Sequence, residues 1–151
     1  MRFAKWGLQG VKMNILKYLV LLCLSLVCYG VEIRNPHTSA TPPNAKNASV
    51  YMDIYNDTNT PITLVSISSK IASKAQIHRT QNHDGMIGME HIDELTIEPL
   101  DSISLEAGGL HIMLMNITKP LLEGEFIDLE LHFKDGTFII IDDIPVLKQS
   151  R

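Results

Sequence analysis

Methionine and histidine side chains gather in the middle of this 151-residue sequence, where residues 78–115 hold four of the seven methionines and four of the six histidines. Thioether sulfur is a soft, neutral ligand that favours Cu(I), and imidazole also accepts copper or zinc. Calcium and magnesium prefer oxygen ligands, and zinc sites use Cys, His and carboxylate. Methionine also fills gaps in hydrophobic cores, so clustering alone is explained more simply by packing. The case for a Cu(I) site therefore depends on where the strands direct these side chains.

The segment 111–115 alternates in a way that separates ligands from core residues. With a period of two, His111, Met113 and Met115 share one face of a strand, and Ile112 with Leu114 occupies the other. The Ile/Leu face has the stronger claim to the core. The opposite face then presents an imidazole beside a thioether, about 7 Å apart along the strand, and two long side chains at that spacing can converge on one ion.

His78 ends a second alternating segment. It shares a face with Lys74 and Gln76, opposite Ala75 and Ile77, and we therefore expect it to point outward. A polar stretch, residues 81–86, follows and is predicted to be a loop that could fold back over the same site.

The spacing of four residues carries a family resemblance. His78, Met89, His111 and Met113 are separated by ten, twenty-one and one residues, which resembles the H-x10-M-x21-H-x-M signature of the periplasmic copper chaperones called the PCuAC family. The resemblance spans residues 31–146. The stretches that continue it are Ala40–Lys46, Ser49–Met52, Gly85–Met89, Ala107–Met115 and Lys119–Leu121.

The resemblance implies a cupredoxin-like Greek-key β-sandwich or barrel with an exposed Cu(I) site formed by His78, Met89, His111 and Met113. Such proteins deliver copper to the dinuclear centre of cytochrome c oxidase or related oxidases, often beside a thioredoxin-like copper chaperone. One residue departs from the family pattern. Arg79 stands where Met or Glu is frequent, and a cation beside the site should slightly disfavour a bound metal ion.

Three further residues are auxiliary candidates. Met86 and Met115 are either extra ligands or sulfur-rich packing, and packing or an indirect role is favoured. His83 lies in the predicted polar loop, where it binds a second copper ion or is simply solvated. His91 is expected to be an ordinary surface residue.

Short alternating runs separated by turn residues predict an all-β fold for the rest of the chain. Asp135-Gly136 between two such runs is a strong signal for a tight hairpin. Residues 31–47, with three prolines, are predicted to be an extended arm. The sum is a sandwich or barrel of about seven to nine strands. The other predicted strands are 49–55, 62–68, 71–78, 94–97, 102–105, 111–115, 126–133 and 137–141.

The N-terminal segment 1–30 reads as a secretory signal peptide that precedes one domain, residues 31–151. It is basic, lacks Asp and Glu, and carries an apolar run at 18–27 that is shorter than a membrane span. Cleavage is expected after Gly30, translation could start at Met13, and an uncleaved membrane anchor is the alternative. Lipidation at Cys28 is disfavoured because bulky Val27 precedes it. The expected location is the periplasm.

Composition excludes several function classes for the expected mature chain. Four of the 13 Lys and Arg precede residue 31, which leaves nine against 17 Asp and Glu, a formal charge of −8. This charge argues against nucleic acid as a partner.

Both cysteines precede residue 31, so the thiolate of an electron-transfer cupredoxin is missing. No nucleophile motif or open three-ligand metal pattern suggests an enzyme. A soluble monomeric copper chaperone is the expectation, and a copper-buffering or resistance protein and a metal-free interaction module are the alternatives.

Overall fold

The computed structural model describes residues 30–83 and 85–149, and within them every regular element is a β-strand. The expected signal peptide lies outside the described residues except for Gly30. No helix in the described part is long and apolar enough to cross a membrane. The strands are β1 (Val31–Ser39), β2 (Asn47–Asn56), β3 (Ile62–Ser68), β4 (Ala72–His83), β5 (Met86–Ile92), β6 (Leu95–Ile97), β7 (Ser102–Leu105), β8 (Leu110–Ile117), β9 (Phe126–Phe133) and β10 (Phe138–Leu147).

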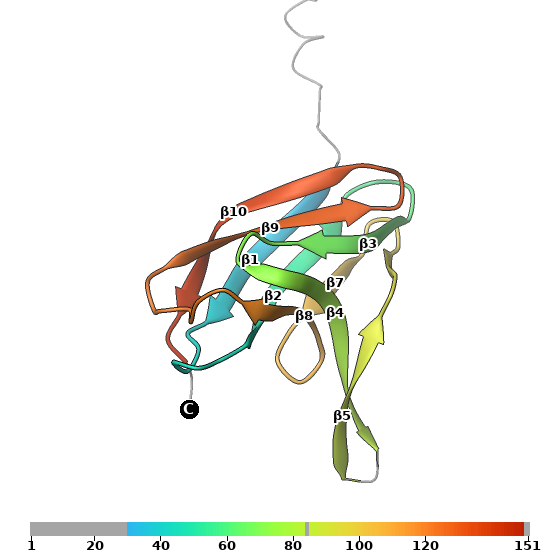
Figure 1. Cartoon of the computed structure of the whole chain (residues 1–151). Coiled ribbons are helices and arrows are strands. Elements are labelled where there is room, and N and C mark those ends of the chain that lie inside the picture. Colours follow the sequence, from blue (N-terminus) through green and yellow to red (C-terminus); the bar gives the residue numbers. More distant parts are fainter. Residues whose placement is uncertain (1–29, 84, 150–151) are drawn as a thin grey trace, which may run out of the picture.

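Hydrogen-bonded neighbours follow the order β5-β4-β8-β2-β1-β10-β9-β3-β6, and β7 adds to β2. A further pairing of β3 with β4, at Ile67 and Ala75, closes seven of these strands into a barrel (Figure 1). Only β1 and β10 run parallel among the pairings of the described residues. The all-β prediction is confirmed.

The barrel encloses one hydrophobic core, which every strand of the closed path supplies through alternate residues. In β2 the burial alternates along almost the whole strand, so that Ala48, Val50, Met52 and Ile54 face inward. In β8 the inward residues are Ile112 and Leu114, which are fully buried, as the sequence predicted. The opposite face of β8 is thereby left for His111, Met113 and Met115.

The hairpin between β9 and β10 forms at the predicted Asp-Gly turn. Gly136 has a φ of 88°, a conformation that other residues rarely adopt, and its N–H donates to the carbonyl of Phe133. The carboxylate of Asp135 accepts hydrogen bonds from both the N–H and the hydroxyl of Thr137. This local chemistry fixes the register of the two strands.

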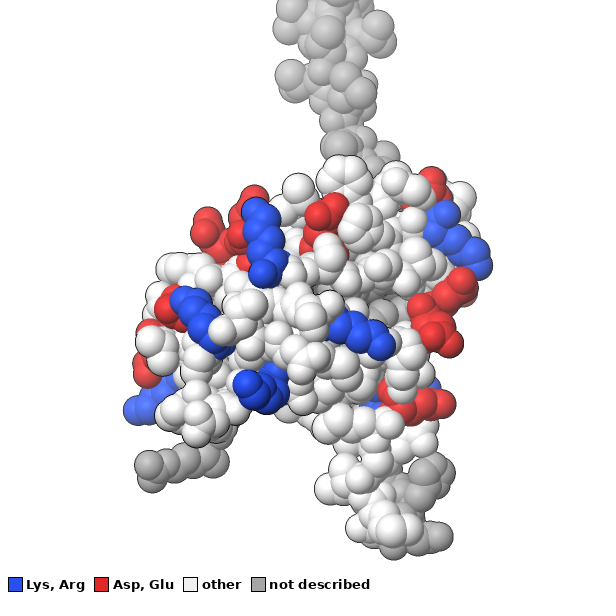
Figure 2. Space-filling view, viewed as in Figure 1, with Lys and Arg blue, Asp and Glu red and all other residues white. Residues whose placement is uncertain are grey.

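The expected loop at 81–86 is wrong, because β4 continues to His83 and turns directly into β5. Gly85, with a φ of 82°, lies in this turn, and His83 pairs with Met86 beyond it. The β4–β5 hairpin projects from the barrel (Figure 1), and the lower part of it is largely free of charged side chains on the face seen in Figure 2. Met86 and Ile87 near its end are each 75% exposed.

The expected arm at the N-terminus of the domain is extended, but it is also a paired strand. β1 pairs antiparallel with β2 and parallel with β10. The register with β2 shifts between Arg34 and His37, so Pro36 lies at a bulge where no ladder hydrogen bond is required of it.

Candidate metal centre

Three histidines stand side by side on three adjacent strands. His78 on β4 is the register partner of His111 on β8 and, on its other side, of His91 on β5. Residues that are directly opposite in neighbouring strands point to the same face of a sheet. The three imidazoles therefore form one row, with His78 in the middle.

The spacing within this row is compatible with a shared metal ion. The ring centroids of His78 and His111 are 6.1 Å apart. With metal–nitrogen bonds of about 2.0–2.1 Å, two imidazoles on one ion have centroids at most about 6.4 Å apart. The separation of the two rings is therefore within the range for a shared ion.

His78 is buried, and its ring lacks the hydrogen bonds that burial normally demands. The residue is 9% exposed, and neither Nδ1 nor Nε2 has a hydrogen-bond partner among the described residues. Leaving a buried polar group unpaired costs about 1–3 kcal/mol. In neutral imidazole one of the two nitrogens carries a lone pair, which a metal ion would use, so this ring has the chemistry of a ligand.

Burial also lowers the pKa of His78, and nearby positive charge on His111, His91 and Lys74 lowers it further. The pKa shift keeps the imidazole neutral over a wider pH range. Neutral imidazole is the form that binds metals.

His111 is held in one orientation by its own strand. It is 4% exposed, and its Nδ1 lies 3.2 Å from the carbonyl oxygen of Gly109. A carbonyl only accepts, so Nδ1 carries the proton and Nε2 keeps a lone pair. Histidines that bind metals commonly donate their other ring N–H to a backbone carbonyl, which fixes the tautomer and the orientation of the ring.

The two predicted methionine ligands lie on the same face as the histidines. Each belongs to a register pair two residues along the strands from the histidines, which we call one row, and the two pairs lie in opposite directions. Met89 is opposite Thr80 on the hairpin, and Met113 is opposite Gln76. One row corresponds to about 7 Å along a strand. Met89 is 59% exposed, whereas Met113 is half-buried and borders a pocket of about 230 Å³. That both thioethers reach the ion held by the histidines stays a prediction.

The auxiliary candidates lie farther from the histidine row. Met115 is opposite Lys74, two rows from His111, and Met86 is near the end of the hairpin, on the face opposite to Met89 by strand alternation. The backbone of His83 pairs with Met86, and its side chain lies outside the described residues. Arg79 is exposed and is opposite Glu90, so alternation directs its charge away from His78.

His78 lies on the face away from Ile77, as predicted, and the structure adds that it is buried there, because β5 and β8 flank it with His91 and His111. His91 is exposed, as expected, but it also belongs to the histidine row. The Asp-Gly pair at 84–85 is the sequence signal for this pairing. A tight turn there pairs residues that are equally distant from it along the chain, as His78 and His91 are.

The donor set fits a soft or borderline metal ion. The imidazoles of His78 and His111 lie side by side on β4 and β8, and Met89 and Met113 lie on the same face on either side of them. In the described ranges, no three His, Cys, Asp or Glu side chains lie close enough together to hold an ion on their own. Imidazole and thioether ligands suit a soft or borderline ion, whereas hard cations prefer oxygen ligands.

A family model described as "Putative lipoprotein LpqE-like" matches residues 31–146 of the chain. "Putative lipoprotein Lxx21020" of Leifsonia xyli subsp. xyli is 31% identical over 90 residues, which cover 59% of this chain and 54% of that protein. "Uncharacterized protein RP573" of Rickettsia prowazekii is 29% identical over 97 residues, or 64% of this chain and 54% of that protein. The matched region thus spans about half the length of these curated relatives.

Solved structures of PCuAC domains share the fold. The copper-bound PCuAC domain from PmoF2 superposes with a TM-score of 0.65 at 22% identity and covers 78% of this chain and 92% of that one. Apo-DR1885 from Deinococcus radiodurans gives 0.62 at 28% identity, covering 82% of each chain. CuI-DR1885 from the same organism gives 0.59 at 28% identity and covers 78% and 76%. The predicted cupredoxin-like fold and the resemblance to PCuAC domains are confirmed.

Proposed function

This chain belongs to the LpqE-like family, and on that premise we propose that it is a copper chaperone of the cell envelope that carries Cu(I) on histidine and methionine. The proposed ligands are His78, Met89, His111 and Met113. The observation that carries the proposal is the buried imidazole of His78, which has two unpaired nitrogens and faces His111 across β4 and β8. CuI-DR1885 and the copper-bound PmoF2 domain, which have this fold, support copper as the cargo.

The proposed site combines a fixed half and an accessible half. His111 and Met113 come from β8, whose alternate residues are fully buried in the core. Met89 comes from the projecting hairpin and is largely exposed. An incoming ligand from a partner can displace an exposed thioether first, while the buried histidines still hold the ion. Stepwise ligand exchange of this kind suits a carrier better than a permanent metal site.

The proposed recipient is the copper subunit of cytochrome c oxidase, reached directly or through a thioredoxin-like copper chaperone. A periplasmic location follows from the signal peptide predicted in residues 1–30, and the lipoprotein names in the family support export to the envelope. The alternative, a copper-buffering protein without a specific recipient, uses the same ligands.

An anaerobic competition titration against a chromogenic Cu(I) chelator tests the binding site. The chain from residue 31 contains all ten strands, and it should bind one Cu(I). His111→Ala and Met113→Leu should each weaken binding. The histidine change should cost more than the roughly 10–100-fold in affinity that is lost when a hydrogen-bond partner of a metal ligand is removed. Met115→Leu, two rows away on the same strand, is the matched control. Unchanged uptake in both site variants would remove the assignment.

Delivery is tested separately in cells. Oxidase activity in a strain lacking the protein should recover with the wild-type chain and not with His111→Ala. If activity is normal without the protein but growth in excess copper is impaired, the buffering function replaces the chaperone function.

A further inference from the structure

The β4–β5 hairpin leaves the barrel at a point where β4 changes its neighbour. At Ala75 the partner of β4 is β3, and from Ile77 onward it is β5. A cavity of about 350 Å³ lies at this change of partner, lined by residues that include Gln76 and His91. No side chain of β5 is buried, and only Ile92 at its end is partly buried against the core. Core packing therefore does little to hold the hairpin in place.

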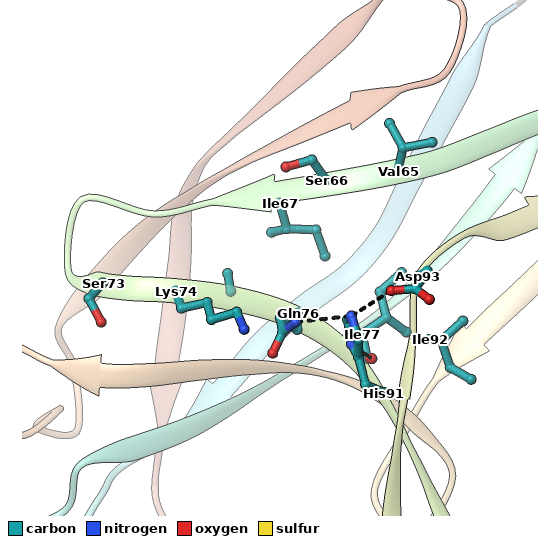
Figure 3. Close-up of a pocket in the computed structure, with 11 residues that line it drawn as sticks. Val65, Ser66, Ile67, Ser73, Lys74, Gln76, Ile77, His91, Ile92 and Asp93 are labelled. Atoms are coloured by element: carbon teal, nitrogen blue, oxygen red, sulfur yellow. Dashed lines mark hydrogen bonds and ion pairs between the residues drawn. The ribbon is translucent and has the colours of Figure 1, made fainter.

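His91 ties β5 to β4 beside this cavity through both of its ring nitrogens. Its Nδ1 lies 3.2 Å from the carbonyl oxygen of Ile77 on β4. Its Nε2 lies 3.0 Å from the side-chain amide nitrogen of Gln76, also on β4. The same Nε2 lies 3.0 Å from a carboxylate oxygen of Asp93, which follows β5. Figure 3 shows the two contacts of Nε2 at the edge of the cavity.

The hydrogen-bond chemistry of His91 is that of a link between strands. The carbonyl of Ile77 only accepts, so Nδ1 carries a proton and donates. If Nε2 is also protonated, it donates to Asp93, and if it is not, its lone pair accepts from Gln76. Both ring nitrogens thus have partners in either protonation state. The contrast with His78 is direct, because neither nitrogen of that ring has a partner among the described residues.

The position of Met89 depends on how the base of the hairpin is held. Met89 precedes His91 by two residues, so alternation directs both side chains to the same face. Met89 is 59% exposed and is not part of the core. A two-stranded hairpin is marginally stable on its own. Side-chain links at its base therefore contribute to fixing where this thioether lies relative to His78.

We propose that His91 is a positioning residue, which holds the base of the hairpin on the barrel and so places Met89 beside the histidine row. The inference rests on the proposed function, since Met89 is one of the proposed Cu(I) ligands. The barrel supplies His78, His111 and Met113, and the hairpin supplies the remaining ligand. Loss of the link should therefore lower Cu(I) affinity through Met89 alone.

Cu(I) competition titrations on the chain from residue 31 test this dependence. His91→Leu should lower the affinity about 3–100-fold, the range of coupling within one network. His91→Asn should lose less, because its amide can still donate to the carbonyl of Ile77. In the Met89→Leu background, adding His91→Leu should change the affinity by less than about twofold. Wild-type affinity in His91→Leu, or a loss that adds in full to that of Met89→Leu, would overturn the inference.

X-ray absorption of the Cu(I) complexes gives a second readout, because it distinguishes sulfur from nitrogen neighbours. The wild type should show the two sulfurs and two nitrogens of the proposed ligands. His91→Leu should lose one sulfur and keep both nitrogens. Loss of a nitrogen instead would show that His91 is a ligand and would overturn the inference.

Amide hydrogen exchange of the metal-free chain tests the link without copper. His91→Leu should speed exchange at least about threefold in the hairpin beyond Ile77 and leave β2 and β8 unchanged. Unchanged exchange in the hairpin, or faster exchange in every strand, would overturn the inference. A wild type that binds no Cu(I), together with faster exchange confined to the hairpin of His91→Leu, would overturn the proposed function and support the link.

His132→Leu is the matched control. The side chain of His132 is 39% exposed against 40% for His91, and it also lies beside a carboxylate, that of Glu130. It is on β9, away from the hairpin. The control should change neither the Cu(I) affinity nor the exchange of the hairpin, and an effect equal to that of His91→Leu would overturn the inference.

Discussion

His78 and His111 are direct register partners on β4 and β8, although β5, β6 and β7 lie between them in the sequence. Both are buried, and their rings are 6.1 Å apart on the face of the sheet that is turned away from Ile77 and Ile112. A polar pair in this position stabilises little by itself, because the nitrogens of His78 have no partner within the described chain. The arrangement makes sense as a ligand pair, and it leads to the following predictions.

Replacing His78 with leucine should stabilise the apo fold while it abolishes Cu(I) binding. The variant removes two unpaired buried nitrogens, whose penalty is about 1–3 kcal/mol, and keeps a side chain of similar size. Chemical denaturation of the two proteins without metal measures the difference in the free energy of unfolding. His132→Leu, at a half-buried position where the ring nitrogens are not both enclosed, should change it by less than about 0.5 kcal/mol. A clearly less stable His78→Leu protein would contradict this interpretation of His78.

Stability should fall in mildly acidic solution because of His78. Its folded pKa is lowered by burial and by positive charge at His111, His91 and Lys74. Above a pH of about 6.5, the ordinary value, the imidazole is neutral in both the folded and the unfolded chain. Below it, the unfolded chain takes up a proton that the folded chain resists, so the free energy of unfolding decreases until the pH reaches the folded pKa.

Urea denaturation between pH 7.5 and 5 checks this pH dependence. The difference between wild type and His78→Gln isolates the contribution of one residue. The difference in the free energy of unfolding should be constant above a pH of about 6.5. Below that pH the wild type should lose stability relative to His78→Gln. Parallel curves for the two proteins would show that His78 does not cause the effect.

Adjacent residues of β8 should separate stability from metal binding. Ile112 is fully buried, so Ile112→Ala should lower the free energy of unfolding by about 2–5 kcal/mol. Met113 points to the other face, and Met113→Leu should change stability by less than about 1.5 kcal/mol while it weakens Cu(I) binding. Thermal denaturation and the chelator competition, run on both variants, give the comparison. A large loss of stability in Met113→Leu would identify this side chain as core packing.

The mature N-terminus should be Val31. Signal-peptide cleavage after Gly30 is predicted from the basic start, the apolar run and the small residue at the cleavage position. Intact mass spectrometry of the exported protein gives the N-terminal residue directly. An acylated Cys28 at the N-terminus would instead establish a lipoprotein, in agreement with the names found in the family.

Most of the barrel was predictable because its strands have one face in the core and one in solvent. β3, β7 and β9 have the predicted bounds, and each alternates or carries β-branched residues between clear turns. The sequence does not predict β5, because this strand has no buried face. Six of its seven residues are exposed on a projecting hairpin, so its hydrophobic residues do not alternate with polar ones as they do in a strand of the core.

The site was predictable only in part, because ligand spacing along the chain does not give the register between strands. The resemblance identified His78, Met89, His111 and Met113 through their fixed separations, and the face of His111 and Met113 followed from alternation alone. Whether Met89 and His91 lie beside His78 depends on the hairpin turn, where the polar sequence predicts a loop. The burial of His78 depends on strands on both sides of it, which only the assembled sheet provides.

The projecting hairpin gives this chain an unusual freedom to diverge. No side chain of β5 is buried, and the last core residue of β4 before the turn is Ile77. Substitutions, insertions or deletions beyond Arg79, the last residue of β4 that pairs with β8, should leave the seven-stranded barrel intact while they change the part of the proposed ligand set that the hairpin carries. The properties of the proposed site can thus change through a short segment that contributes no side chain to the core.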